Sequence, residues 1–481
     1  MKRIFRSLSL VLFFISQMLA VGSDLDWSKQ PALGAEPAFK VPIPVRFQLT
    51  NGLKVLAISN SKLPLIAMGL VIPGAGSATD PTGQAGLAAF TADLLDESAG
   101  TLGALQISEL QDRLGSKISA YAAVDAAFVD VSCLTRTLDA TLDLFATIVT
   151  QPTFETGEVK RVHNDRLTNL KLRRDRPREV AAILFNEMLY GAESGYGHAT
   201  AGYVKEFEKL DSAAARGFYE AAWDPAKMTL VVAGDINPEQ LRSKLETRLG
   251  SWKRVAKAAL KTLPSPPANL DTRLVLVDRP NAEQSDTHFG LVGIKRTDPK
   301  RAAFEVAVEV LGGGFTGRLT QRLREQLGYV YHAYSSMDFR RELGPFSAVA
   351  AFHTPKTVDG IKETIGMVRD LAEKDVPEAE LHKTKQNMMR SLPLKFETNR
   401  GIVNAYKVAA LEDLPLDWYD RWLKEISKVS ATDVRSAAKE LLPENRLVFV
   451  LVGAVPVIRS GLEELGLGRA KLYDLDGTPI K

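Results

Sequence analysis

The sequence predicts an α+β protein made of two similar halves, each with a mixed or antiparallel sheet and helices on one of its faces. A chain of 481 residues is too long for one hydrophobic core, which indicates two large domains. A cap-and-helix signal followed by an apolar strand occurs twice, and Gly234 and Gly453, which end the two strands, stand 219 positions apart. The segment between the repeats is polar, rich in proline and lacks periodicity. We therefore expect a linker at 253–272 that joins domains 41–252 and 273–481 as a clam-shell.

The elements of the first half follow a clear order, and the second half repeats its last steps. Alternating apolar positions predict strands, and a spacing near 3.6 residues predicts helices. We predict strands at 54–58 and 64–72, helices at 87–96 and 107–114, strands at 117–123 and 127–134, helices at 138–150 and 155–174, and a strand at 228–234. The matching strand of the second half is predicted at 447–453. Strands and helices clustered in this way are typical of an α+β layer.

The first 22 residues have the pattern of a secretory signal peptide. Three basic residues precede an apolar run at 8–20, which ends in small residues. The run is too short to span a membrane as a helix. The single cysteine, Cys133, lies far from the predicted cut, so no lipid anchor is expected there. We therefore predict that 1–22 is removed and that the protein is periplasmic, without a stable membrane anchor.

The charge of the chain gives no support for a nucleic-acid partner. Removing the three basic residues of the signal peptide from 61 Lys and Arg leaves a balance with the 58 Asp and Glu. The basic cluster at 171–178 is interpreted as a solvated helix face. Because only one cysteine is present, no internal disulfide is possible.

One stretch near the start of the chain resembles a metal-binding helix whose ligands are missing. Residues 86–95 read G-L-A-A-F-T-A-D-L-L. The stretch resembles the G-L-A-H-F-L-E-H of the pitrilysin-family (inverted zincin) metallopeptidases, in which two His four positions apart hold zinc and the Glu between them is the general base. The resemblance places Ala89 and Asp93 at the two His positions and Ala92 at the Glu.

The third zinc ligand of that family, a Glu on a long helix further along the chain, is also missing. Its place falls at Asn169 or the neighbouring Thr168. The resemblance therefore implies that this chain binds no metal through that motif and is not itself the zinc peptidase.

The histidines offer no local replacement for this site. No two of the six His stand three to five positions apart, although a site assembled from distant His stays open as an alternative. His163 and His382 lie on polar helices and are expected to face solvent. His198 lies in G-Y-G-H-A-T-A-G, which resembles the P-Y-G-H loop near the family's active cleft, with Gly195 in place of the Pro. Two interpretations of His198 remain, a substrate-binding residue and a structural loop residue.

The second half contains a glycine-rich segment that leads into a predicted helix and strand. Residues 311–328 read L-G-G-G-F-T-G-R-L-T-Q-R-L-R-E-Q-L-G. Leucines every four residues predict a helix with a buried stripe, Thr316 is a candidate N-cap, and Gly328 is a candidate left-handed end. A strand is predicted at 329–337. The segment resembles the family's G-G-G-F-x-S-R-L-x-x-x-L-R-E-x-x-G-x-x-Y, with Gly317 in place of the Ser.

The triple glycine is expected at a substrate-binding cleft. A phosphate loop would need a following Lys-Ser/Thr and a preceding strand, which this segment lacks. We therefore expect Gly312, Gly313 and Gly314 to permit close approach of the backbone at the mouth of the cleft.

In the family, an Arg and a Tyr seven positions apart in this segment hold the substrate and stabilise charge on the attacked carbonyl. The resemblance places them at Arg324 and Tyr331, and an alternative alignment gives Arg322 and Tyr329. A guanidinium and a phenol are suitable donors to an oxyanion, worth roughly a few kcal/mol when water is excluded. The competing interpretation is a surface arginine and a packing tyrosine.

These features lead to three hypotheses for function. The first is a non-zinc subunit of an exported heterodimeric zinc metalloendopeptidase, as in mitochondrial processing peptidase and its bacterial relatives. Its homologous partner would carry an intact H-x-x-E-H and the zinc, and both subunits would bind the peptide substrate. The second is a non-catalytic peptide-binding or structural protein of the same fold. The third is a homodimeric enzyme with another metal site.

Overall fold

The computed structural model describes residues 39–253 and 273–480. The predicted signal peptide and nearly all of the predicted linker lie outside these residues. Val41–Lys481 make up one compact unit, and the architecture below is that of this unit. None of the helices in the described ranges is both long enough and apolar enough to cross a membrane.

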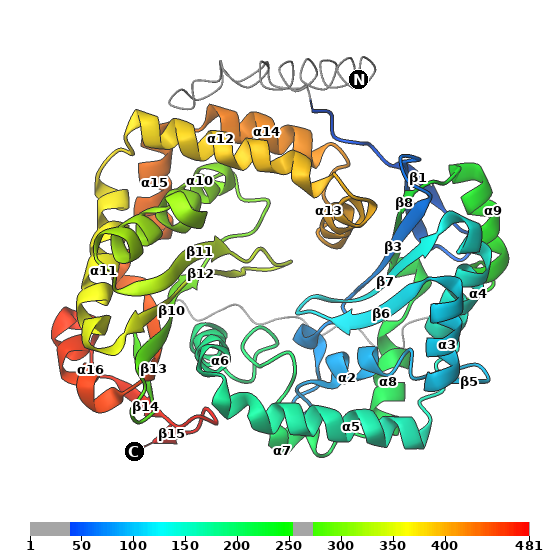
Figure 1. The fold of residues 1–481 in the computed structure, drawn as a ribbon, viewed down its shortest axis with the longest axis horizontal. Coiled ribbons are helices and arrows are strands. Elements are labelled where there is room, and N and C mark those ends of the chain that lie inside the picture. Colours follow the sequence, from blue (N-terminus) through cyan, green and yellow to red (C-terminus); the bar gives the residue numbers. More distant parts are fainter. Residues whose placement is uncertain (1–38, 254–272, 481) are drawn as a thin grey trace, which may run out of the picture. The chain divides into compact units, whose positions relative to one another are not determined.

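The first sheet has six strands in the order β1-β2-β8-β3-β7-β6 (Figure 1). Only β2 and β8 pair in parallel, and every other neighbouring pair is antiparallel. The strands predicted from alternation lie where expected, and no end differs from its prediction by more than one residue. The bounds are β1 Val45–Gln48, β2 Lys54–Ser59, β3 Leu65–Pro73, β6 Lys117–Ala122, β7 Ala126–Leu134 and β8 Thr229–Gly234, and a separate hairpin is formed by β4 Ser98–Ala99 and β5 Leu102–Gly103.

The helices of the first half begin at recognisable caps. The Asp211 carboxylate accepts from the Ala214 N–H at the start of α8, and the Asn237 side chain accepts from two N–H groups at the start of α9. The helix predicted at 155–174 ends at Lys171 and continues as a 3-10 turn to Asp175, and Pro177 is the first residue of the next helix. The bounds are α2 Leu87–Asp93, α3 Ala104–Leu114, α4 Leu138–Thr150, α5 Thr156–Lys171, α6 Pro177–Tyr190, α7 Val204–Phe207, α8 Ser212–Ala222 and α9 Pro238–Leu249.

The second sheet repeats the topology of the first. Its order is β11-β12-β10-β13-β9-β14-β15, and β9 and β13 form a parallel pair that corresponds to β2 and β8. The flanking pairs β13–β10, β10–β12 and β12–β11 are antiparallel, as are β8–β3, β3–β7 and β7–β6. The bounds are β9 Leu274–Asp278, β10 Gln284–Val292, β11 Val330–Met337, β12 Pro345–His353, β13 Val448–Gly453, β14 Lys471–Tyr473 and β15 Pro479–Ile480. Two similar mixed sheets confirm the predicted fold class.

Among the described residues, the second half has seven α-helices, one fewer than the first half. Their bounds are α10 Arg301–Gly312, α11 Thr357–Glu373, α12 Glu378–Lys395, α13 Asn399–Leu411, α14 Trp418–Lys428, α15 Ala431–Leu441 and α16 Val455–Leu462, with π-helical stretches η6 Thr320–Gln326 and η9 Glu463–Leu467. Short 3-10 turns are η1 Ser77–Thr79, η2 Thr135–Thr137, η3 Leu172–Asp175, η4 Pro225–Lys227, η5 Gly314–Thr316, η7 Thr354–Lys356 and η8 Glu444–Arg446.

Each sheet has its own hydrophobic core on the face that its own helices cover. Phe90, Phe145 and Trp223 are fully buried in the first core, and Phe304 and Phe449 in the second. Helices on one face of each sheet are what the sequence predicts.

The other face of each sheet is covered by one helix from the opposite half. Helix α6 packs against β10 and β13, and α13 packs against β3 and β8 (Figure 1). The two helices hold the same place in the repeat, because each follows the long helix of its half, α5 or α12. Two further hydrophobic cores therefore contain residues of both halves. The exact domain boundaries and the clam-shell arrangement stay predictions.

Candidate functional site

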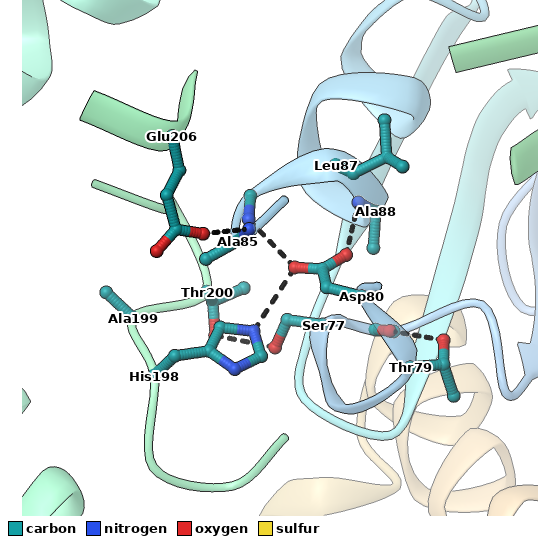
Figure 2. A network of polar contacts seen from close by, with 12 residues as sticks. Ser77, Thr79, Asp80, Ala85, Leu87, Ala88, His198, Ala199, Thr200 and Glu206 are labelled. Carbon is teal, nitrogen blue, oxygen red and sulfur yellow. Dashed lines mark hydrogen bonds and ion pairs between the residues drawn. The ribbon is translucent and has the colours of Figure 1, made fainter. Parts of the chain in front are cut away.

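The stretch that resembles a zinc helix is α2, and its start is held by a buried acid and a buried histidine. The Asp80 carboxylate accepts from the Gly86 N–H (2.8 Å) and the Ala88 N–H (2.7 Å) at the start of the helix (Figure 2). His198 Nε2 lies 3.2 Å from Asp80 Oδ2, and its Nδ1 lies 3.0 Å from the Ser194 carbonyl oxygen. Both His198 ring nitrogens therefore have partners within the protein.

His198 is better explained as a structural residue than as a substrate contact. Its side chain is only 7% exposed, beside an Asp80 side chain that is 1% exposed. Burial opposes the charge of the imidazole, but the hydrogen bond and charge of Asp80 raise the pKa of His198 above its usual value. The pair joins the loop around His198 to the start of α2, and this geometry supports the structural interpretation.

The first predicted His position and the predicted Glu position are filled by small buried residues. Ala89 is 4% exposed and Ala92 is fully buried. Asp93, at the second predicted His position, has the only polar side chain of the three. Its Oδ2 lies 2.6 Å from Arg166 Nε on α5. A guanidinium is therefore ion-paired at the position where the resemblance would place a metal ligand.

Arg166 is the residue of this site that the sequence did not single out. It lies on α5, three positions before Asn169, so the two side chains share one face of the helix. Asn169 and Thr168 are exposed, and Thr168 Oγ1 donates to the Asn164 carbonyl oxygen of the same helix. Within the described ranges, no group of three or more His, Cys, Asp or Glu is arranged to hold a metal ion.

Further acidic residues follow α2 and meet the same helix α5. Glu97 forms a close ion pair with Arg161, which also bonds Glu158 at 2.9 Å. Burial raises the pKa of Asp96 to about 6. The end of α2 is therefore joined to α5 by two arginine–carboxylate contacts.

The prediction that His163 faces solvent is wrong, and that for His382 is confirmed. His163 Nε2 lies 2.9 Å from the Phe207 carbonyl oxygen, and its ring stacks on Phe207 and meets the edge of Phe90. The apolar neighbours turn this side of α5 toward the core despite its polar sequence. His382 is exposed on α12.

The triple glycine lies where α10 meets β11. A Cβ built on Gly312 would overlap the Ser335 backbone nitrogen, and one on Gly313 would overlap the Glu309 carboxyl group. Gly314 has a φ of +60°, in the left-handed region that glycine favours. The expected close approach of the backbone is therefore present, while the contact with substrate stays a prediction.

The helix after the glycines differs from the prediction at its start and agrees at its end. Thr316 belongs to a 3-10 turn and is not the cap, because Gly317 precedes the first helical residue. The buried Thr320 Oγ1 instead donates to the Gly314 and Ala333 carbonyl oxygens, and the helix is π-helical from there. Gly328 has a φ of +64° and ends the helix as predicted.

Arg324 and Tyr331 lie side by side with open access. The guanidinium carbon of Arg324 is 5.2 Å from the centroid of the Tyr331 ring and 5.5 Å from that of Phe315. Tyr331 is 75% exposed and Phe315 is 73% exposed. The guanidinium also lies 3.3 Å from its chain neighbour Glu325, an exposed pair of little strength. Both donors can therefore reach a bound molecule.

The alternative pair is already occupied within the protein. Arg322 donates from two nitrogens to the Glu363 carboxylate, at 2.8 and 3.2 Å. Tyr329 lies under the Lys356 ammonium, 5.4 Å from the ring centroid. The geometry thus favours Arg324 and Tyr331 as the pair free to act.

Two family models match the chain and together span more than half of it. "Insulinase (Peptidase family M16)" matches residues 54–189, and "Peptidase M16 inactive domain" matches residues 209–388. The chain belongs to peptidase family M16, the pitrilysin family. It is an M16 protein of the inactive type, since the residues of the zinc motif are replaced at Ala89, Ala92 and Asp93.

Bacterial M16 relatives match most of the chain. A protein of Mycobacterium tuberculosis called an uncharacterized zinc protease is 26% identical over 85% of this chain and 92% of its own length. A protein of Helicobacter pylori called a non-peptidase homolog is 23% identical over 84% of this chain and 93% of its own length.

Two solved bacterial structures have the same fold. The crystal structure of a peptidase M16 inactive domain from Pseudomonas fluorescens superposes with a TM-score of 0.78 at 23% identity, and covers 85% of this chain and 98% of its own. The crystal structure of a protease from Helicobacter pylori superposes with a TM-score of 0.81 at 18% identity, and covers 86% of this chain and all of its own. At these identities the likeness shows the fold alone.

Proposed function

We propose that this protein is the non-zinc subunit of an exported heterodimeric M16 metalloendopeptidase. It would bind the peptide together with a homologous subunit that carries an intact H-x-x-E-H and the zinc. Arg324 and Tyr331 would donate hydrogen bonds to the attacked carbonyl as negative charge develops on its oxygen. This chain's own part is therefore binding, orientation and charge stabilisation.

The observation that carries the proposal is the contrast between two half-sites, the zinc-like helix α2 and the Arg324–Tyr331 pair. The zinc-like helix is closed by the Asp93–Arg166 ion pair and by buried alanines. Tyr331 is exposed and Arg324 is half-buried, and the only ion pair of Arg324 among the described residues is the weak one with Glu325.

The test is reconstitution with a homologous chain from the same cell that carries H-x-x-E-H. We expect the purified chain without residues 1–22 to contain no zinc and to cleave no peptide. Mixing should give hydrolysis beyond that of the partner alone, and kcat should fall roughly 100-fold for Arg324→Ala or Tyr331→Phe. Arg322→Ala and Tyr329→Phe serve as matched controls and should change kcat little.

The second candidate is a non-catalytic peptide-binding or structural protein. The description of the Helicobacter pylori relative as a non-peptidase homolog favours it. A mixture no more active than the partner alone, in a complex that still binds peptide, would support this candidate and contradict the first. Stoichiometric zinc with hydrolysis by the isolated chain would contradict both.

A further inference from the structure

A cavity of about 760 Å³ lies at the end of α5, beside the loop at the start of α2, because its lining residue Glu206 accepts from the Ala85 N–H. It is enclosed by α5, α6, α7 and the chain segment at 475–478. Its apolar wall consists of Leu170, Val180, Ile183, Leu184, Val204 and Leu475. This volume is typical of sites that hold small molecules.

The acidic groups around the cavity are satisfied by the protein itself. Glu187 Oε1 accepts from the Tyr203 hydroxyl at 2.5 Å, and Glu206 Oε2 accepts from the Ala85 N–H at 2.8 Å. Asp476 forms a close ion pair with Arg174. Each of these carboxylates therefore already has a hydrogen-bond or ion-pair partner within the protein.

Two lysines at the edge of the cavity, unlike these carboxylates, have no partner for their charged groups among the described residues. Lys171, the last residue of α5, and Lys205, on α7, both line the cavity and are exposed. Neither ammonium is hydrogen-bonded or ion-paired to another residue in the described ranges. By contrast, Arg173 and Arg174 are paired with Glu179 and Asp476. The available charge at the mouth is positive.

One wall of the cavity is a well-formed turn near the end of the chain. The Asp474 carboxylate accepts from the Asp476 and Thr478 N–H groups. Gly477 has a φ of +78° and lies against Leu184 of α6, where a Cβ would approach its Cδ2 to 3.4 Å. The cavity is thus built from segments about 300 positions apart in sequence and is already formed without a ligand.

We propose that this cavity binds a single-chain carboxylate amphiphile of the fatty-acid class. The acyl chain would lie along the apolar wall, and the carboxylate would lie between Lys171 and Lys205. Burial of an acyl chain is favourable by about 0.8 kcal/mol per CH₂, and the two ammonium groups select a negative head group. This site is independent of the peptidase role proposed above.

The first experiment compares head groups on the same twelve-carbon chain. The chain without residues 1–22 is titrated by calorimetry with dodecanoate, dodecanol and dodecyltrimethylammonium. The two ionic compounds are kept below their micelle concentrations and dodecanol below its solubility limit. We expect one dodecanoate per protein, bound at least 10-fold more tightly than the other two. Absence of saturable binding, or equal binding of all three, would overturn the proposal.

The second experiment locates the site with variants. The double variant Lys171→Ala/Lys205→Ala should weaken dodecanoate binding at least 10-fold, and Ile183→Trp should abolish it by filling the cavity. Lys160→Ala, an exposed lysine of α5 outside the cavity, is the matched control and should bind as the parent does. Circular dichroism and thermal melting verify that each variant is folded. If the double variant binds dodecanoate like the parent, the ligand binds elsewhere and the assignment is wrong.

Discussion

Arg166 and Asp93 explain at the scale of single residues why the zinc-like helix is stable without zinc. Asp93 is partly buried, with a side chain that is 35% exposed, and a lone carboxylate there would lose hydration. The guanidinium of Arg166, 19% exposed, offsets this loss with hydrogen bonds at 2.6 Å. The ion pair replaces the metal–ligand bonds that join the equivalent helices in the enzymes that the sequence resembles.

Removing one member of this pair should cost more than removing both. We expect Arg166→Ala to lower the free energy of unfolding by about 1 kcal/mol, a value reduced by partial exposure. The double variant Asp93→Ala/Arg166→Ala should recover part of the loss, since no charge is left unpaired. Urea denaturation of the four proteins of the cycle measures the coupling. Additive losses would show that the pair contributes nothing.

Asp96 is a residue whose effect on stability depends on pH. Burial raises its pKa in the folded state to about 6, from an ordinary value of 3.8. Folding therefore disfavours the charged form of Asp96. Below about pH 4 the group is neutral in both states and costs no stability, and as pH rises to about 6 it lowers the free energy of unfolding.

Asp96→Asn should consequently stabilise the protein at pH 8 and have almost no effect at pH 4. Urea denaturation at the two pH values measures the difference. Asp165→Asn, at an exposed carboxylate of α5, is the control and should be near neutral at both. A gain that is larger at pH 4 than at pH 8 would contradict the assigned cause.

At the scale of elements, the contact between α10 and β11 positions the Arg324–Tyr331 pair. Tyr331 lies on β11, and Arg324 lies on the π-helical stretch between the two elements. Gly312 lets the end of α10 lie directly on the backbone of β11 at Ser335. The glycine therefore acts on the pair through the placement of the strand.

Gly312→Ala should lower the free energy of unfolding by about 1–3 kcal/mol, because its Cβ would overlap the Ser335 backbone. We also expect a lower kcat in the reconstituted complex, with the change measured at substrate saturation. Gly366→Ala is the matched control, since its Cβ meets nothing within 4 Å on α11 and alanine favours a helix. Equal stability of the two variants would contradict the role given to Gly312.

At the scale of the whole unit, the exchanged helices α6 and α13 join the two halves. Lys407 of α13 is 5% exposed, and its Nζ lies 2.6 and 2.8 Å from the two carboxylate oxygens of Asp130 on β7. Its aliphatic stem fits over Gly69, where a Cβ would lie 2.6 Å from Cδ. Opening the halves would expose two cores and separate this pair.

Lys407→Ala should therefore lower the free energy of unfolding by about 3 kcal/mol, the cost of leaving a largely buried carboxylate unpaired. Lys407→Ala/Asp130→Ala should be less costly than the single change. Lys428→Ala, an exposed lysine of α14, is the control. Calorimetry measures the effect, and we expect one transition for both halves of the parent protein. Two separate transitions in the parent would show that the exchange does not couple the halves.

The sequence by itself determined the repeat, most of the elements and the loss of the zinc ligands. These features depend on residue identity and on the short-range spacing of apolar residues, which predicts, for example, the strands that end at Gly234 and Gly453. The position of the Arg324–Tyr331 pair also followed from one continuous segment.

Only the tertiary structure decided what surrounds those residues. Asp93 meets Arg166 from 73 positions away, and Lys407 meets Asp130 from 277 positions away. Glu363, on another helix, likewise pairs with Arg322, a contact that the segment around Arg322 does not predict. Such contacts depend on how separate helices and sheets pack. A buried charged group needs a partner, but the local sequence pattern does not specify which distant residue will lie beside it.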